Sequence, residues 1–401
     1  MFFVGLLWGI ALATAVGVVV IILFGPGSVQ RKPINVDTSS WIETGDGILT
    51  DATEAKVEAM RETIHEYFYQ EVTDEELTDA MLHGMIDALD DKYSAYYSAE
   101  EWKATVEGMS GSFVGIGVYV EKDEVTGYVR LLKIIKGTPA EKYGLQSGDL
   151  IMKADDVELS GLNLDNAVAQ IRGDRGTEVK LTLLRDSEVM EVTIVRDKVL
   201  VDTVEYELLE DGIAYIAIQS FDEITAEQFK KALRNAYSDQ MKGLIIDLRG
   251  NGGGYLDVVT EILQQILPKG IITYTVDKNG LREDYECDGT KELSVPLVLL
   301  TDGYTASASE LFAGAVRDYN KGLLVGTKTY GKGIVQVYYP FSDGTCLKLT
   351  NSAYYTPSGQ CIHEIGIEPD IEVPFDGMLY MEQNIDNQLE RAIEEMQNLI
   401  N

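Results

Sequence analysis

The sequence predicts a multidomain α/β protein, in which a layered α/β core is preceded by a β-rich module and flanked by helical terminal regions. Apolar strand-like segments alternate with amphipathic helical patterns from residue 201 onward, which is typical of a layered α/β core. Between residues 104 and 197 the pattern changes to short strands punctuated by glycine. Residues 51–103 and 376–401 show the apolar spacing of helices.

The first 24 residues carry no charged side chain, and as a helix they would be long enough to cross about 30 Å of hydrocarbon. We therefore expect a transmembrane anchor over 1–24. A cleaved signal peptide is the alternative, but the apolar run exceeds the usual core of about 7–15 residues, and no small-x-small cleavage site follows Phe24. Arg31 and Lys32 follow the span, and the positive-inside tendency would place them in the cytoplasm.

The remaining segments follow in order. Residues 25–50 are polar and predict a linker. In the helical region, 51–103, Thr73 and Glu76 have the spacing of a capping box at a helix start. The β-rich module, 104–197, contains short strands, a helix over 165–171, and a closing hairpin of 179–185 with 189–195.

The core occupies 198–375. Its apolar strands are expected at 213–218, 243–248, 297–301 and 323–326, and its helices at 225–237, 255–267 and 309–318. Functional side chains of such a core lie where the strands end. A single helix over 377–399, within the terminal region 376–401, is expected to close the chain.

The chain has 33 Lys and Arg against 66 Asp and Glu, which gives a net charge of −33. Because phosphate backbones are bound by clustered cations, this balance disfavours a nucleic-acid-binding protein. The three cysteines show no CxxC spacing and the three histidines form no HExxH motif, so we predict neither a metal site nor a disulfide framework. No cofactor is predicted.

Two glycine-rich motifs end strands of the core. Residues 247–254 open a helix, but Tyr255 stands where a dinucleotide fingerprint needs Gly or Ala, so an oxyanion site or a plain βα turn remains. Residues 326–333 nearly match a phosphate-binding loop. Gly333 replaces its Ser or Thr, and a strand over 334–339 follows instead of a helix, which disfavours an ATPase.

A third motif, Thr305-Ala306-Ser307-Ala308-Ser309-Glu310, joins a buried strand to a helix. Ser307 and Glu310 have capping-box spacing, but a serine at a helix start is also a candidate nucleophile. No histidine lies at a strand end, so a Ser-His-Asp triad has little support. Lys332 ends the next strand, and it can act as a base if burial lowers its pKa.

Together, Asp247 to Gly254, Thr305 to Glu310 and Tyr330 to Gln336 resemble the carboxyl-terminal processing peptidases, which are PDZ-containing serine proteases related to tail-specific and photosystem D1-processing proteases. The resemblance covers nearly the whole chain after the linker, including Gly84 to Ser94. It implies a Clp-protease/crotonase-like protease core over 198–375 with an inserted PDZ domain over 104–197.

The resemblance also implies the site residues. Ser307 would be the nucleophile, Lys332 the general base and Gln336 the residue that orients Lys332. The oxyanion hole would be formed by the backbone N–H groups of Ala308 and Gly253. Ser309 is the alternative nucleophile. The peptide carboxylate would bind the loop formed by Val114, Gly115, Ile116 and Gly117, for which a β-bulge-rich turn is the simpler interpretation. Arg172 would contact the protease core when a docked peptide opens the site.

We therefore expect a single-pass protein of the cell membrane whose extracytoplasmic serine endopeptidase domain binds C-terminal tails of proteins and cleaves through a Ser/Lys dyad and an acyl-enzyme. Apolar or basic tails suit the acidic body better than acidic ones. A homodimer through the terminal helices is a further expectation from the family. The alternatives are a catalytically silent PDZ scaffold and an acyl-CoA enzyme on a crotonase-like core, in which the Ser/Lys set would have no role.

Overall fold

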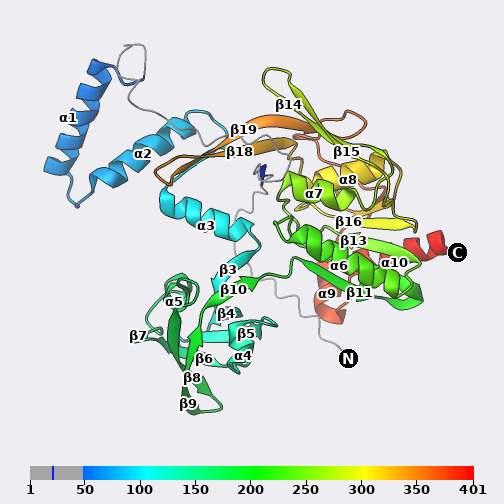
Figure 1. Ribbon diagram of the computed structural model, residues 1–401, viewed down its shortest axis with the longest axis horizontal. Helices are drawn as coiled ribbons and strands as arrows, with labels where there is room; N and C mark the ends of the chain where they lie inside the picture. Colours follow the sequence, from blue (N-terminus) through cyan, green and yellow to red (C-terminus); the bar gives the residue numbers. More distant parts are fainter. Residues whose placement is uncertain (1–19, 22–47) are drawn as a thin grey trace. The chain divides into compact units, whose positions relative to one another are not determined.

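The computed structural model describes residues 20–21 and 48–401, which divide into two compact units (Figure 1). The smaller unit spans Val106–Asp202, and the larger unit contains the chain up to Thr105 together with Thr203–Asn401. The predicted anchor, 1–24, lies outside the described residues except for β1 (Val20–Ile21), a two-residue strand. In the described part of the chain, no helix combines the length and the apolar character needed to cross a bilayer.

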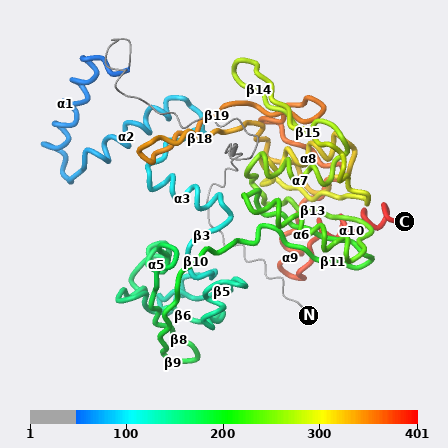
Figure 2. Tube along the Cα trace, viewed as in Figure 1, coloured from blue at the N-terminus to red at the C-terminus, as the bar shows by residue number. Residues whose placement is uncertain are grey.

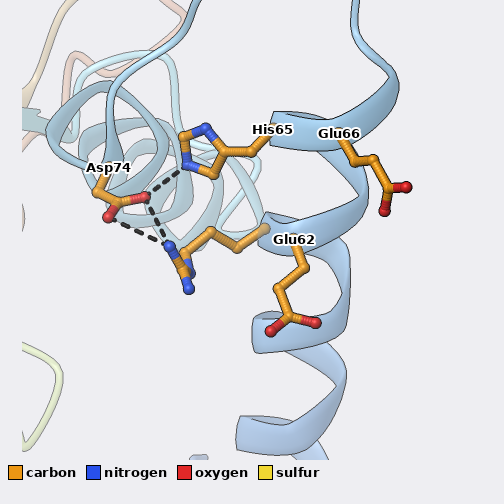
Figure 3. A pocket seen from close by; sticks show the side chains of 5 residues that line it. Glu62, His65, Glu66 and Asp74 are labelled. Atoms are coloured by element: carbon orange, nitrogen blue, oxygen red, sulfur yellow. Dashed lines mark hydrogen bonds and ion pairs between the residues drawn. The ribbon is translucent and has the colours of Figure 1, made fainter.

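The N-terminal region of the larger unit contains α1 (Asp51–Tyr67) and α2 (Asp74–Asp87). The predicted capping box starts α2, because the Thr73 N–H donates to the Glu76 carboxylate and the Glu76 N–H donates to the Thr73 hydroxyl. Asp74 links the two helices by accepting hydrogen bonds from His65 and Arg61, as Figure 3 shows. These side chains are exposed, so their ion pairs contribute little stability.

The helical region departs from its predicted pattern at two places. A short strand, β2 (Ala95–Tyr97), interrupts it because these residues pair with β19 of the sheet described below. A third helix, α3 (Ala99–Met109), continues past residue 104, where the β-rich module was expected to start. Pairing with a distant strand is not visible in local apolar spacing, which explains the first difference.

The smaller unit is built on an antiparallel sheet in the order β4 (Val118–Lys122), β5 (Val129–Ile134), β6 (Leu150–Ala154), β8 (Glu178–Arg185) and β9 (Glu188–Val195), with β7 (Val157–Glu158) beside β6. Two short helices, α4 (Pro139–Lys142) and α5 (Leu164–Ile171), accompany it. β3 (Ser112–Gly115) pairs separately with β10 (Asp197–Leu200). The predicted 179–185/189–195 hairpin is confirmed by β8 and β9.

The central sheet of the larger unit has the order β11 (Val204–Leu208), β12 (Ile213–Ile218), β13 (Gly243–Asp247), β16 (Leu297–Thr301), β17 (Leu323–Gly326) and β20 (Ile371–Glu372). All its neighbours are parallel except β11 with β12. Every residue of β13 and β16 is buried, as expected for parallel strands covered on both faces. The intervening helices are α6 (Thr225–Ser238), α7 (Leu256–Leu263) and α8 (Ala308–Asp318).

A second sheet contains β18 (Ile334–Pro340), β19 (Cys346–Tyr355), β14 (Gly270–Asp277) and β15 (Arg282–Cys287), with β2 paired to β19 and β1 to β18. Figure 1 shows β18 and β19 running side by side as an antiparallel pair. β18 begins directly after Lys332 and Gly333, so the strand predicted at 334–339 is confirmed.

The C-terminal region is two helices rather than the predicted single one: α9 (Gly377–Gln383) and α10 (Asn387–Ile400). The break falls at Asn384, which has a left-handed backbone (φ 56°), and at Asp386, whose carboxylate caps the start of α10. α10 lies along the central sheet (Figure 2), where Ala392 and Met396 pack into its core.

Candidate active site

Ser307 lies on the sharp turn between β16 and α8. Its backbone has φ 61° and ψ −118°, a region that costs a residue with a β-carbon about 1–3 kcal/mol. This strained strand-to-helix turn is the arrangement that exposes a serine nucleophile in other hydrolases. The Ser307 Oγ is buried and makes no hydrogen bond within the described residues. A buried hydroxyl without a structural partner is a candidate for chemistry.

The capping box expected at Ser307 is only half formed. The Glu310 carboxylate accepts a hydrogen bond from the Ser307 N–H at 2.9 Å. The Glu310 N–H, however, donates to the Ser307 carbonyl at 2.9 Å and not to the hydroxyl. The cap therefore uses the main chain of Ser307 and leaves its Oγ available.

The Glu310 carboxylate joins the two predicted catalytic segments. Its Oε2 accepts from the N–H of Ser307 at 2.9 Å and of Lys332 at 2.8 Å. Its Oε1 accepts from the Gly331 N–H at 2.7 Å and the Thr329 hydroxyl at 2.6 Å. Burial raises the pKa of Glu310, and these hydrogen bonds oppose that shift. Because all four partners are donors, the geometry is that of an ionised carboxylate.

Tyr354 of β19 forms a second bridge between the same segments. Its hydroxyl lies 2.8 Å from the Ser307 carbonyl oxygen and 2.6 Å from that of Lys332. Ser307 and Lys332 thus share one carboxylate at their amides and one hydroxyl at their carbonyls. Their main chains are held side by side by two fully buried groups.

Lys332 is fully buried between β17 and β18. Burial of the ammonium, assisted by the nearby Lys348 cation, lowers the pKa of Lys332 to about 7, although Asp91 and Glu310 act in the opposite direction. Its Nζ lies 4.6 Å from the centroid of the Tyr93 ring. A lysine with this pKa is neutral in a substantial fraction of molecules near pH 7, as a general base must be.

Gln336 of β18 is also fully buried. Its Nε2 donates to the Thr350 hydroxyl at 3.2 Å, while its Oε1 has no hydrogen-bond partner in the described part of the chain. Gln336 therefore offers an open acceptor inside a buried site.

The predicted oxyanion groups meet at the same turn. Gly253 has φ 108°, and a β-carbon on it would lie 2.9 Å from the Ser307 Cβ and 3.0 Å from the Ala308 nitrogen. Only glycine permits this approach. No hydrogen bond from the Ala308 N–H is found within residues 48–401. The Gly253 N–H, in contrast, donates to Asn251 Oδ1 at 2.9 Å, so this bond must open before Gly253 can serve as an oxyanion donor.

The hydroxyl of Ser309, the alternative nucleophile, is already used in a structural hydrogen bond. It donates to the Asn251 carbonyl at 2.9 Å. We expect Ser309→Ala to lower stability by about 1 kcal/mol, the usual contribution of such a hydrogen bond, and to retain kcat within about threefold. Thermal denaturation and peptide cleavage measure the two effects, and an inactive but folded Ser309→Ala protein would reverse the assignment of the two serines.

In the smaller unit, the predicted carboxylate loop joins β3 to β4. Val114 and Gly115 end β3, while Ile116 and Gly117 lie in the connection, where their N–H groups donate no hydrogen bond among the described residues. β4, which follows the loop, is an edge strand of its sheet. Arg172 follows α5, and its guanidinium lies 5.5 Å from the Phe113 ring centroid.

Sequence reasoning missed three contributors to the site. Glu310 was interpreted as a helix cap, although it also binds the Lys332 segment. Tyr354 gave no signal in the sequence, because nothing distinguishes it from the other aromatic and apolar residues of its strand. Thr350 gave no signal in the sequence either.

Among the described residues, no group of His, Cys, Asp and Glu side chains is arranged to hold a metal ion.

Three family models match consecutive parts of the chain: the activating protease CtpB N-terminal domain over 29–101, the PDZ domain over 103–184 and peptidase family S41 over 212–373. A CtpA-like serine protease of Staphylococcus aureus is 35% identical over 374 residues, which cover 92% of this chain and 72% of that protein. One from Staphylococcus saprophyticus is 36% identical over 321 residues, which cover 79% and 65%. The chain thus spans about two thirds of the length of these relatives.

Among solved structures, an S41 protease from Bacteroides fragilis matches with a TM-score of 0.51 at 17% identity, over 86% of this chain and 97% of that chain. At this identity the match concerns the fold.

Proposed function

Because the chain belongs to peptidase family S41, with CtpA-like serine proteases as its relatives, we propose that it is a serine endopeptidase that binds the C-terminal tail of a protein in its PDZ domain and cleaves the polypeptide upstream. One observation carries the assignment of the site. Ser307 has a strained backbone and an Oγ without a hydrogen-bond partner among the described residues, and its main chain shares Glu310 and Tyr354 with that of Lys332.

In the proposed mechanism, the Ser307 Oγ attacks the scissile carbonyl while neutral Lys332 accepts the hydroxyl proton. The protonated lysine then gives that proton to the leaving amine, which leaves an acyl-enzyme. Lys332 next takes a proton from water and the resulting hydroxide attacks the ester. The protonated lysine then returns that proton to the Ser307 Oγ as the C–O ester bond breaks and the acid product leaves. No cofactor has a role in these steps.

The developing oxyanion would be stabilised at the start of α8, where the Ala308 N–H is available. A second donor would come from the glycine turn, either from Gly253 after its bond to Asn251 opens or from its neighbours Gly252 and Gly254. Ser307, Lys332 and Gln336 are all fully buried, so a substrate requires the site to open. In this proposal, docking of a tail in the PDZ domain opens the site, and a role for Arg172 in that step follows from the family resemblance alone.

The PDZ part of the proposal predicts a specific loss of tail binding. Gly117 has φ 88°, and a β-carbon on it would lie 2.3 Å from the Thr138 Cβ, so Gly117→Ala must displace the carboxylate loop. We expect it to weaken binding of a tail peptide by about tenfold or more. Fluorescence anisotropy with the Ser307→Ala protein as background measures this without cleavage.

Gly176→Ala is the matched control, because Gly176 has φ 83° and open space around its Cβ position. It imposes similar backbone strain away from the loop and should bind like the parent. Equal affinities for Gly117→Ala, Gly176→Ala and the parent would contradict the assignment of the loop.

We further propose that the chain is a single-pass membrane protein anchored through residues 1–24, with its protease domain outside the cytoplasm, and that it forms a homodimer. The uncharged composition of 1–24 supports the anchor. The dimer is supported by α1, which buries no residue in this chain and exposes Val57 and Met60. Protease accessibility on whole cells and sedimentation of the purified protein test the two statements.

The decisive experiment for the function is labelling of the chain by a fluorophosphonate in the presence of a tail peptide, together with cleavage of an unfolded protein that carries the same tail. A serine endopeptidase gives both signals, and Ser307→Ala gives neither. Tail binding without labelling or cleavage would instead identify a catalytically silent PDZ scaffold.

A further inference from the structure

The loop Asp91-Lys92-Tyr93-Ser94, here the 91–94 loop, follows α2 and lies against the proposed catalytic side chains within the larger unit. β2 begins directly after it and pairs with β19, with Ala95 opposite Lys348. This pairing attaches the end of the loop to the strand that carries Thr350. The loop thus belongs to the N-terminal region in sequence and to the protease site in space.

A directed chain of hydrogen bonds runs from Gln336 to this loop. The Gln336 Nε2 donates to the Thr350 Oγ1 at 3.2 Å, and the Thr350 Oγ1 donates to the Asp91 Oδ2 at 2.6 Å. Asp91 also accepts from the Ser94 hydroxyl at 2.6 Å, and the Ser94 Oγ accepts from the Thr350 N–H at 3.1 Å. Burial raises the pKa of Asp91, but the hydrogen bonds from Ser94 and Thr350 outweigh it and lower the pKa, so this carboxylate is ionised.

The ionised carboxylate fixes the direction of the chain. It can only accept, so the Thr350 hydroxyl must give its proton to Asp91 and present a lone pair to Gln336. Gln336 must then turn its NH₂ group toward Thr350. The other end of the amide, Oε1, is left as the buried acceptor that has no partner among the described residues. An acceptor is what a lysine needs once it has taken the serine proton.

The same loop covers the base from a second side. The Tyr93 side chain is 6% exposed, and the Lys332 Nζ lies 4.6 Å from its ring centroid. An aromatic face at this distance stabilises the protonated form of a lysine. The loop therefore contributes to Lys332 both directly and through the amide of Gln336.

We propose that Asp91 is a positioning residue of the catalytic centre, which acts through Thr350 to hold the Gln336 amide with its Oε1 ready to accept a hydrogen bond from protonated Lys332. The proposal rests on the proposed peptidase function. It makes the N-terminal region a working part of the active site, so that movement of α2 and β2 would change turnover without any contact to the substrate.

The charged groups that face Lys332 determine the expected pH dependence. Lys348 comes from β19, Glu310 from α8, and Asp91 and Lys92 from the loop. Asp91 and Glu310 raise the pKa of Lys332, whereas Lys348 and Lys92 lower it. Removal of the Asp91 charge should therefore lower the pKa of Lys332 and move the acid limb of the kcat/KM profile to lower pH.

The test uses the full chain and three substitutions, assayed on a tail-bearing substrate that wild type cleaves and Ser307→Ala does not. Asp91→Asn replaces the acceptor-only carboxylate by an uncharged amide, which also carries a donor and no longer fixes the direction of the Thr350 hydroxyl, and Thr350→Val removes that hydroxyl; both keep the volume nearly constant. We expect both to lower kcat by about tenfold or more with little change in KM. Thr350→Ser retains the hydroxyl and should restore most of kcat. Only Asp91→Asn should move the acid limb to lower pH, because only it removes a charge.

Asp343→Asn is the matched control. Asp343 accepts from the N–H and hydroxyl of Thr345 in the exposed β18–β19 turn, the same kind of Asp–Thr pair away from the site. It should behave as wild type. Asp91→Asn and Thr350→Val with kcat within about twofold of wild type would overturn the proposal, as would Thr350→Ser as impaired as Thr350→Val. A wild-type chain that neither cleaves nor labels would instead overturn the proposed function, and this inference with it.

Discussion

Ser307→Ala is expected to lower kcat for tail cleavage by about 10⁴-fold or more, because the variant has no atom that can form the acyl-enzyme. The fold should persist. The main-chain bonds of Ser307 to Glu310 and Tyr354 do not involve the hydroxyl, and the Oγ has no partner within the described residues. Steady-state cleavage and thermal denaturation measure the two expectations on the same protein.

Ser309→Ala provides the control for this experiment, because it deletes a hydroxyl of the same size two residues away. A Ser307→Ala protein that unfolds, yet retains the specific activity of its folded fraction, would show that Ser307 serves the helix start only. Wild-type turnover by a folded Ser307→Ala protein would show that Ser307 is not the nucleophile.

Lys332→Met should be similarly inactive, and the wild-type pH profile should identify the reason. Lys332 must be neutral to accept the serine proton, and burial lowers its pKa to about 7. As the pH falls through that value the lysine becomes protonated, so kcat/KM should fall about tenfold per pH unit below it. Initial rates between pH 5 and 9 on one tail substrate measure this acid limb of the kcat/KM profile.

Neighbouring charges allow the limb to be assigned to Lys332 rather than to another group. Lys348 lowers the pKa of Lys332, so Lys348→Met should raise that pKa and shift the limb to higher pH, opposite to Asp91→Asn. Lys332→Met should also keep a folded structure, because methionine fills the same buried volume without an ammonium to desolvate. A limb that stays fixed in both neighbouring variants would exclude Lys332 as the group that titrates.

Much of the core was readable from local patterns. The apolar runs at 243–248 and 297–301 gave β13 and β16, and the motifs that follow them gave the turn at Gly253 and the turn at Ser307. Strands that are buried on both faces have nearly continuous apolar sequence, and tight turns require glycine. These signals lie within a few residues of the feature that they predict.

Other features were not predicted, because a second local signal or a distant segment of the chain decided the structure there. The terminal helix 377–399 broke at Asn384 and Asp386, where a left-handed residue and a new cap outweighed the apolar spacing. Ala95–Tyr97 became a strand because β19 pairs with it. The spacing of Ser307 and Glu310 also fitted a capping box through the Ser307 hydroxyl, but the Glu310 N–H bonds the Ser307 carbonyl instead.

By itself, the sequence determined the order of the family segments along the chain and named Ser307, Lys332 and Gln336 as the candidate site residues, since both depend on motifs along the chain. The tertiary structure decided how they are held. Tyr354 and the 91–94 loop reach the site from distant segments, and Glu310, three residues after Ser307, also binds the Lys332 segment. The hydrogen bonds of these groups set which hydroxyl is left open and which end of an amide is presented. Such choices depend on the direction of hydrogen bonds between buried groups, and that direction exists only when the chain has brought the groups together.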